Sequence, residues 1–150
     1  MTDTQIASTK HEGLISKLIA TYRELNLSVR QLPEDRLTSG GPDGSIRSII
    51  ARMRLDEMLF AQALKQQVTG VVVGALNDEE LEALRQSDDS TTMLISQFGS
   101  ARETTLSLLR GLSEEEWTAS TAEGKSILQH IEELIRSDEQ QMQRLKQLIG

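Results

Sequence analysis

Two carboxylates occupy positions on the apolar stripes of two predicted helices. Glu57 shares helical spacing with the apolar residues Ile49, Met53, Phe60 and Leu64, and Asp138 shares it with Ile131, Leu134, Met142 and Leu145. Side chains three and four residues apart lie on one helix face, so both carboxylates are expected to face a core. A buried ionised carboxylate is costly unless it is paired, hydrogen-bonded or bound to metal. The stripes therefore predict a polar centre inside a helical core.

The residue types elsewhere limit the chemistry that such a centre can perform. The chain has no cysteine, which excludes disulfides, thiol catalysis and thiolate metal sites. Its two histidines, His11 and His130, cannot supply a three-histidine metal site from one chain. No nucleophile-elbow motif accompanies a histidine, and the segment 70–74 lacks the Gly-Lys-Ser/Thr end of a phosphate loop. Nucleophilic and nucleotide-dependent chemistry are thus not indicated.

Charge and hydropathy limit the partners. The net charge of −7 argues against nucleic acid, whose binding usually needs a basic surface. No apolar run approaches the roughly 20 residues of a membrane span. The polar start of the chain has no apolar segment typical of a signal peptide. We therefore expect a cytoplasmic domain with neither a nucleic-acid nor a membrane partner.

Helical periodicity predicts four long helices, at about 11–32, 46–68, 89–110 and 126–149. Pro33 ends the first helix, Ser45 is the expected N-cap of the second, and Gly70 ends it. A turn-rich linker covers 38–44, a short helix 78–85, and a capping box at Ser113 opens a turn that carries Trp117.

These elements predict an all-α fold, an up-down four-helix bundle with a long middle connection. One domain is expected to span 1–150, because this length fits one domain. Residues 1–10 are expected to be poorly ordered, with His11 fraying beside them.

The segments before the second and fourth helices are similar, at 44–49 and 124–128, and the segment 112–117 reads Leu-Ser-Glu-Glu-Glu-Trp. Over nearly the whole chain this layout resembles the DinB-like (YfiT-like) superfamily of four-helix bundles. Metal-binding members of that family carry three ligand histidines, at positions that match Arg52, Ser137 and Gln141 here. The family's neighbouring acids match Glu57 and Asp138. The resemblance thus implies a degenerate metal site that retains the acids and lacks the ligands.

Without imidazoles, we expect no metal or other cofactor. One alternative remains, in which Asp56, Glu57 and Asp138 hold a hard cation such as calcium or magnesium through oxygen ligands. The leading hypothesis is that Arg52, helped by Arg136, supplies the missing positive charge and pairs with Glu57 or Asp138. A solvated Arg52 is the competing interpretation. The candidate polar centre is Arg52, Asp56, Glu57, His130, Asp138 and Gln141.

His130 and Tyr22 each have a plain structural interpretation besides a functional one. His130 flanks its stripe, so a half-buried imidazole bonded to a carbonyl or carboxylate is expected before a catalytic one. Tyr22 could direct its hydroxyl into the polar centre, since a buried hydroxyl seeks a partner, but core packing is the favoured role.

Three functions are compatible with these residues. The first is a non-catalytic binding or structural, stress-related protein that forms a homodimer. The second, implied by the resemblance, is a metal-dependent thiol transferase or hydrolase-like enzyme, against which the three missing histidines argue. The third is a small-molecule binder with a cavity in the bundle core.

Overall fold

The chain is helical in every regular element of a computed structural model that describes residues 3–71, 76–121 and 124–150. Side chains are described from residue 9 onward, except at position 42. Within these ranges there are eight helices, and the single β-bridge joins Ser120 to Ser126. No helix in the described ranges is long and apolar enough to cross a membrane. The prediction of an all-α fold is confirmed.

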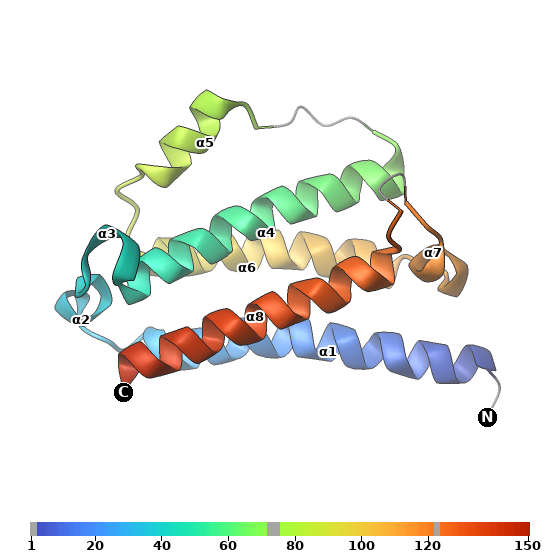
Figure 1. The fold of residues 1–150 in the computed structure, drawn as a ribbon, viewed down its shortest axis with the longest axis horizontal. Coiled ribbons are helices and arrows are strands. Elements are labelled where there is room, and N and C mark those ends of the chain that lie inside the picture. Colours follow the sequence, from blue (N-terminus) through green and yellow to red (C-terminus); the bar gives the residue numbers. More distant parts are fainter. Residues whose placement is uncertain (1–2, 72–75, 122–123) are drawn as a thin grey trace.

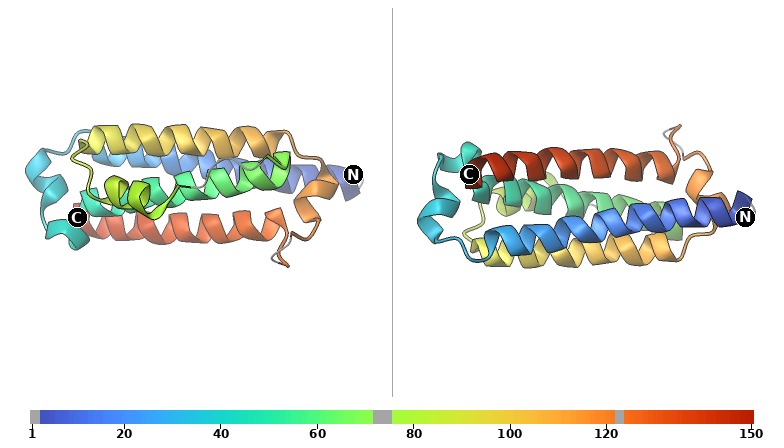
Figure 2. Two further views of the ribbon diagram at one scale, coloured as in Figure 1. Left: turned by 90° about the horizontal axis from the view of Figure 1, so that it is seen from above. Right: turned by 90° about the horizontal axis from the view of Figure 1, so that it is seen from below.

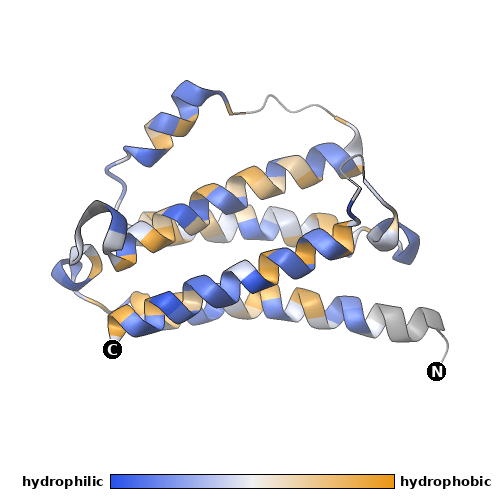
Figure 3. Cartoon of the chain, in the orientation of Figure 1, coloured by the Kyte–Doolittle hydropathy of each residue, from blue (hydrophilic) through white to orange (hydrophobic). Residues whose placement is uncertain are grey.

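Four long helices lie side by side: α1 (Asp3–Val29), α4 (Ile46–Thr69), α6 (Thr91–Arg110) and α8 (Ile127–Ile149) (Figures 1 and 2). α1 begins at one end of this group, and α8 finishes at the opposite end (Figure 1). Hydrophobic and hydrophilic residues alternate along each of the long helices, as amphipathic helices require (Figure 3).

The four long helices do not simply alternate in direction. α4 and α6 run parallel, and this is the most extensively packed pair of helices (Figure 1). The segment between them contains α5, and α6 begins at the same end of the molecule as α4 (Figure 1). The expected up-down order therefore holds for α1 with α4 and for α6 with α8, and is wrong for the middle pair.

The core consists of two apolar clusters. One contains Leu25, Ile50, Phe98 and Leu145, and the other contains Leu18, Leu64, Leu109 and Ile131. On each long helix the residues between the two clusters include a buried polar side chain: Thr21, Glu57, Arg102 and Thr105, and Asp138. The sequence thus divides the core into two apolar layers with a polar layer between them.

Serine and asparagine caps define where the helices begin. Ser45, Asn77, Ser90, Ser113 and Ser126 each accept a hydrogen bond from the backbone N–H three residues later. Ser113 and Ser126 form complete capping boxes. Gly70 ends α4 with φ of 71°, a left-handed conformation in which glycine avoids the strain of a side chain. The predicted cap at Ser45, stop at Gly70 and capping box at Ser113 are confirmed.

Four short helices complete the fold: α2 (Glu34–Thr38), α3 (Gly41–Gly44), α5 (Asp78–Arg85) and α7 (Glu114–Thr118). The segment 38–44, predicted as a turn-rich linker, is therefore partly helical. α5 lies beside α4 on the outside of the long helices (Figure 1). Residues 72–75, which overlap the segment 70–74, lie outside the described residues, and so do residues 122–123.

The first helix is longer than its apolar stripe predicts. α1 begins at Asp3, so His11 lies well inside the helix. His11 is buried, with 5% of its surface exposed. The imidazole stacks on Trp117 with ring centroids 4.3 Å apart, and its Nδ1 lies 2.7 Å from Oε2 of Glu114. The expectation for His11 is wrong because α7, which lies far away in sequence, covers this turn of α1.

Candidate functional site

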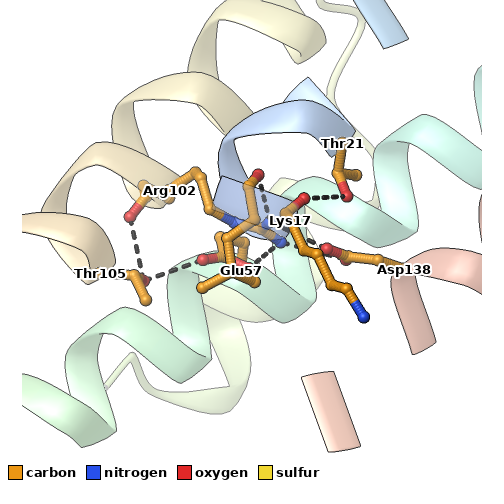
Figure 4. A network of polar contacts seen from close by, with 8 residues as sticks. Lys17, Thr21, Glu57, Arg102, Thr105 and Asp138 are labelled. Atoms are coloured by element: carbon orange, nitrogen blue, oxygen red, sulfur yellow. Dashed lines mark hydrogen bonds and ion pairs between the residues drawn. The ribbon is translucent and has the colours of Figure 1, made fainter. Parts of the chain in front are cut away.

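A buried arginine lies at the centre of the polar layer, between the two carboxylates that the sequence placed there. Arg102 of α6 donates from Nη1 to Oδ2 of Asp138 at 2.9 Å and from Nη2 to Oδ1 of the same residue at 3.1 Å (Figure 4). It also donates from Nη2 to Oε1 of Glu57 at 2.9 Å. One guanidinium thus links α4, α6 and α8.

The remaining contacts complete this network. Arg102 Nη1 donates to the carbonyl of Leu18 in α1 at 3.0 Å, and the Thr105 hydroxyl donates to Oε2 of Glu57 at 2.8 Å. The guanidinium carbon lies 4.9 Å from the centre of the Phe98 ring, a cation–π distance. Four of the five N–H groups of Arg102 are bonded, and its Nε has no partner among the residues that the structure describes.

Burial makes this network strongly electrostatic. The side chains of Arg102 and Glu57 are 2% and 1% exposed, and that of Asp138 is 8% exposed. Burial by itself lowers the pKa of Arg102, but the hydrogen bonds and negative charges of Asp138 and Glu57 outweigh burial and raise that pKa. The arginine is therefore a permanent cation, and its two carboxylate partners compensate its charge.

Glu57 and Asp138 lie together in the core as the stripes predict, but their cation was missed. Helical spacing in the predicted helix at 89–110 favours a stripe through Phe98, Ala101 and Thr105. From Phe98 onward, the buried residues of α6 are Phe98, Arg102, Thr105, Leu106 and Leu109. Arg102 follows Phe98 by four residues and precedes Leu106 by four, so helical spacing could have placed it on the buried face. A charged residue within an apolar stripe is the sequence feature that could have identified Arg102 as the buried cation.

Arg52, the cation that the sequence favoured, does not join the polar layer. Its side chain is 72% exposed, and its Nε lies 3.7 Å from Oδ2 of Asp56, which is 54% exposed. Partial burial raises the pKa of Asp56, while the charge and hydrogen bond of Arg52 lower it, and the net effect is upward. The pairing of Arg52 with Glu57 or Asp138 is wrong because five residues along a helix turn Arg52 away from Glu57. Arg136, its proposed helper, is exposed.

Other candidate residues lie on the surface rather than in the core. Gln141 is half-buried and accepts a hydrogen bond from Arg144 at 3.4 Å. A groove of about 540 Å³ is lined by Arg52, Asp56 and Gln141. Arg52 and Gln141, two of the three positions at which the resemblance predicts ligand histidines, therefore line one groove. Ser137, the third position, is exposed.

His130 and Tyr22, the two side chains with alternative interpretations, are both partly buried. His130 is half-buried, and lines a hollow of about 190 Å³ together with Phe60 and Ile127. The Tyr22 ring is tilted against that of Phe98, with centroids 6.2 Å apart. Core packing is thus the role for which Tyr22 has a direct contact.

Arg54 is a second buried cation that the sequence analysis missed. Its side chain is 1% exposed. It donates from Nη1 to Oε1 of Gln97 at 2.8 Å, and from Nη2 to the carbonyl of Leu84 at 2.7 Å. The nearest carboxylate oxygen, Oδ2 of Asp89, is 3.5 Å from Nη1. Arg54 connects α4 with α5 and with the start of α6.

The arrangement favours structural electrostatics over catalysis. Among the described residues, no group of three or more histidine, cysteine, aspartate or glutamate side chains could hold a metal ion. Both carboxylates of the polar layer already accept hydrogen bonds from Arg102, and Glu57 also accepts from Thr105. Comparison with protein-family models, with curated proteins and with solved structures finds no match to this chain.

Proposed function

We propose that the chain is a non-catalytic, DinB-like four-helix-bundle domain in which Arg102 supplies the positive charge that a metal ion supplies in other members. The observation that carries this proposal is the guanidinium held between Glu57 and Asp138. A divalent ion beside two carboxylates neutralises both of their charges, whereas the single charge of a buried arginine offsets one of the two and needs no imidazole ligands. On this proposal the domain is a binding or structural, stress-related protein in the cytoplasm.

Accessibility supports the non-catalytic role. A general acid or base must reach the proton that it transfers, and a metal catalyst keeps a coordination position open for substrate. Glu57 is 1% exposed and both of its carboxylate oxygens accept hydrogen bonds. Asp138 is likewise held by a bidentate guanidinium. These two acids are therefore committed to Arg102 rather than available to a substrate.

The residues at the family's ligand positions support the same proposal. Arg52 and Gln141 line a groove, and Ser137 is exposed. None of the three side chains provides the imidazole nitrogen that transition metals favour, and Arg52 adds a positive charge to the groove. A homodimer remains part of this proposal.

Metal titration tests the proposal. Calorimetric titration of the full chain with zinc, nickel and manganese, with and without a low-molecular-weight thiol, is expected to give no saturable one-to-one binding. The reason is that the buried carboxylates already have a permanent cation as their partner. Two variants locate any binding that is observed. Glu57→Gln changes the buried acid of the polar layer, and Asp56→Asn changes its exposed neighbour.

Tight stoichiometric binding that Glu57→Gln abolishes and Asp56→Asn preserves would contradict the proposal and favour a metal-dependent enzyme. Weak binding that both variants leave unchanged is the behaviour of adventitious surface carboxylates and agrees with it.

A further inference from the structure

A second pocket, of about 320 Å³, lies where α4 begins, between α3 and the end of α5. Its lining includes three arginines, Arg47, Arg54 and Arg85, and four hydroxyl residues, among them Ser48 and Ser87. No aspartate or glutamate belongs to this lining. In a chain with a net charge of −7, a pocket with three cations and no acid is a distinct local environment.

Two of the three arginines of this pocket already lie 3.5 Å from a carboxylate oxygen, Arg54 from Oδ2 of Asp89 and Arg85 from Oε2 of Glu82, so its positive charge is partly compensated. Arg54 is buried, its Nε has no hydrogen-bond partner, and its nearest carboxylate oxygen, on Asp89, is 3.5 Å away. Arg47 donates to the Ser87 carbonyl at 3.4 Å. Burial lowers the pKa of Arg54, Asp89 raises it, and the positive charge of Arg47 lowers it further. An anion in the pocket would relieve this repulsion.

The polar groups of the pocket also suit one kind of anion. Guanidinium groups present planar pairs of N–H donors that match the oxygens of phosphate. Ser45 caps α4, a helix of 24 residues, and the first N–H groups of a helix together with its dipole favour negative charge. The Ser48 hydroxyl already donates to the Ser45 carbonyl at 2.6 Å, so recognition of the anion rests on the guanidinium groups and the helix N-terminus.

We propose that this pocket binds the phosphoryl group of a small molecule, held by Arg47, Arg54 and Arg85 beside the first turn of α4. A phosphoryl group carries about −1.5 to −2 charge at pH 7, more than the single charge of a carboxylate, which suits a site with three cations. The pocket volume of about 320 Å³ is at the lower end of the range for ligand sites, so the ligand is a small phosphate monoester or inorganic phosphate. This inference does not depend on the polar layer or on the proposed function.

Binding to the full chain tests the inference with two probes, inorganic phosphate and glycerol 3-phosphate, against acetate and chloride at equal ionic strength. Both phosphoryl probes are expected to raise the melting temperature in a saturable way, because a ligand of the native state stabilises it by mass action. A tighter dissociation constant for glycerol 3-phosphate than for phosphate would identify an ester as the ligand, and equal constants would identify inorganic phosphate.

Three arginine variants locate the site. Arg47→Gln and Arg85→Gln are each expected to weaken phosphate binding about tenfold, since each removes a charged hydrogen bond. Arg110→Gln is the matched control, because Arg110, like Arg85, is an exposed arginine of a helix paired with a glutamate. It should leave the affinity unchanged.

Two results would overturn the inference. One is stabilisation by the phosphoryl probes no greater than that by acetate or chloride. The other is phosphate binding that Arg47→Gln and Arg85→Gln weaken no more than Arg110→Gln does. Because Arg85 is 59% exposed and Arg47 is partly exposed, both variants should fold, and their melting temperatures without ligand show whether they do.

Discussion

Arg102 shows how a single residue can set the character of a helical core. A buried ion pair is costly to desolvate and stabilises a fold only when its geometry and hydrogen bonds are nearly complete. Arg102 meets this condition with four hydrogen bonds to three residues from three other helices. Even so, the cost of desolvating three charges offsets much of their attraction, so the network is weak evidence for high stability. It fixes instead which turns of α1, α4, α6 and α8 face one another.

Replacing this arginine should be strongly destabilising. Arg102→Met leaves Glu57 and Asp138 buried without their cation, so the free energy of unfolding is expected to fall by about 3–5 kcal/mol at neutral pH. Urea denaturation followed by circular dichroism measures this loss.

Two further variants separate the missing charge from the missing side chain. The triple variant Arg102→Met, Glu57→Gln, Asp138→Asn should recover most of the stability, since it removes all three charges together. Thr105→Val is a milder change that keeps all three charges. It should lower the free energy of unfolding by about 1–2 kcal/mol, because it removes one hydrogen bond to Glu57. A triple variant no more stable than Arg102→Met would show that the charge network is not the cause.

At the scale of elements, the contact of α1 with α6 depends on a glycine. Gly99 lies within α6, where glycine is unfavourable compared with alanine by about 1 kcal/mol. A Cβ atom built at this position would lie 2.6 Å from the Tyr22 ring of α1. The ring in turn contacts Phe98. The glycine thus permits close packing of α1 on α6 at the expense of helix propensity.

Gly99→Ala is therefore expected to destabilise the fold by about 1–3 kcal/mol, because the overpacked Tyr22 ring must move. The control is Gly13→Ala in α1, where an added Cβ meets nothing within 4 Å. That variant should gain about 0.5–1 kcal/mol from helix propensity. Thermal unfolding of both variants measures the difference. Equal stabilisation by the two alanines would exclude the proposed clash.

At the scale of the whole molecule, stability is distributed unevenly. The four long helices surround both apolar clusters, whereas α5 contributes no buried residue and lies outside them (Figure 1). α5 is connected to the remainder through the hydrogen bond from Arg54 to the Leu84 carbonyl. An element with few buried apolar contacts opens at a lower free energy than the core.

Hydrogen exchange of the native chain should reveal this difference. Backbone amides of α5 are expected to exchange well before those of α4, α6 and α8 next to the polar layer. Phosphate should slow exchange in the first turn of α4 if the pocket beside it is occupied, and leave α8 unchanged. Protection of α5 equal to that of α6 would contradict the peripheral role assigned to it.

The sequence by itself determined the helices and the two acids of the core. Helical periodicity, the serine caps and Gly70 are local signals, because they depend on residues within one or two turns. They placed α4, α5, α6 and α8 within about two residues, and assigned Glu57 and Asp138 to the buried face. The resemblance to the DinB-like superfamily remains a prediction.

Only the tertiary structure decided which cation those acids meet. Arg52 is near Glu57 along the chain, and Arg102 is 45 residues away, yet Arg102 makes the contact. The choice depends on the parallel arrangement of α4 and α6 and on the rotation of α6, which brings Arg102 rather than Ala101 inward. The burial of His11 and Arg54 has the same origin, because α7 and α5 cover them from distant positions. Local patterns specify which face of a helix is buried, and only packing between helices specifies what that face contacts.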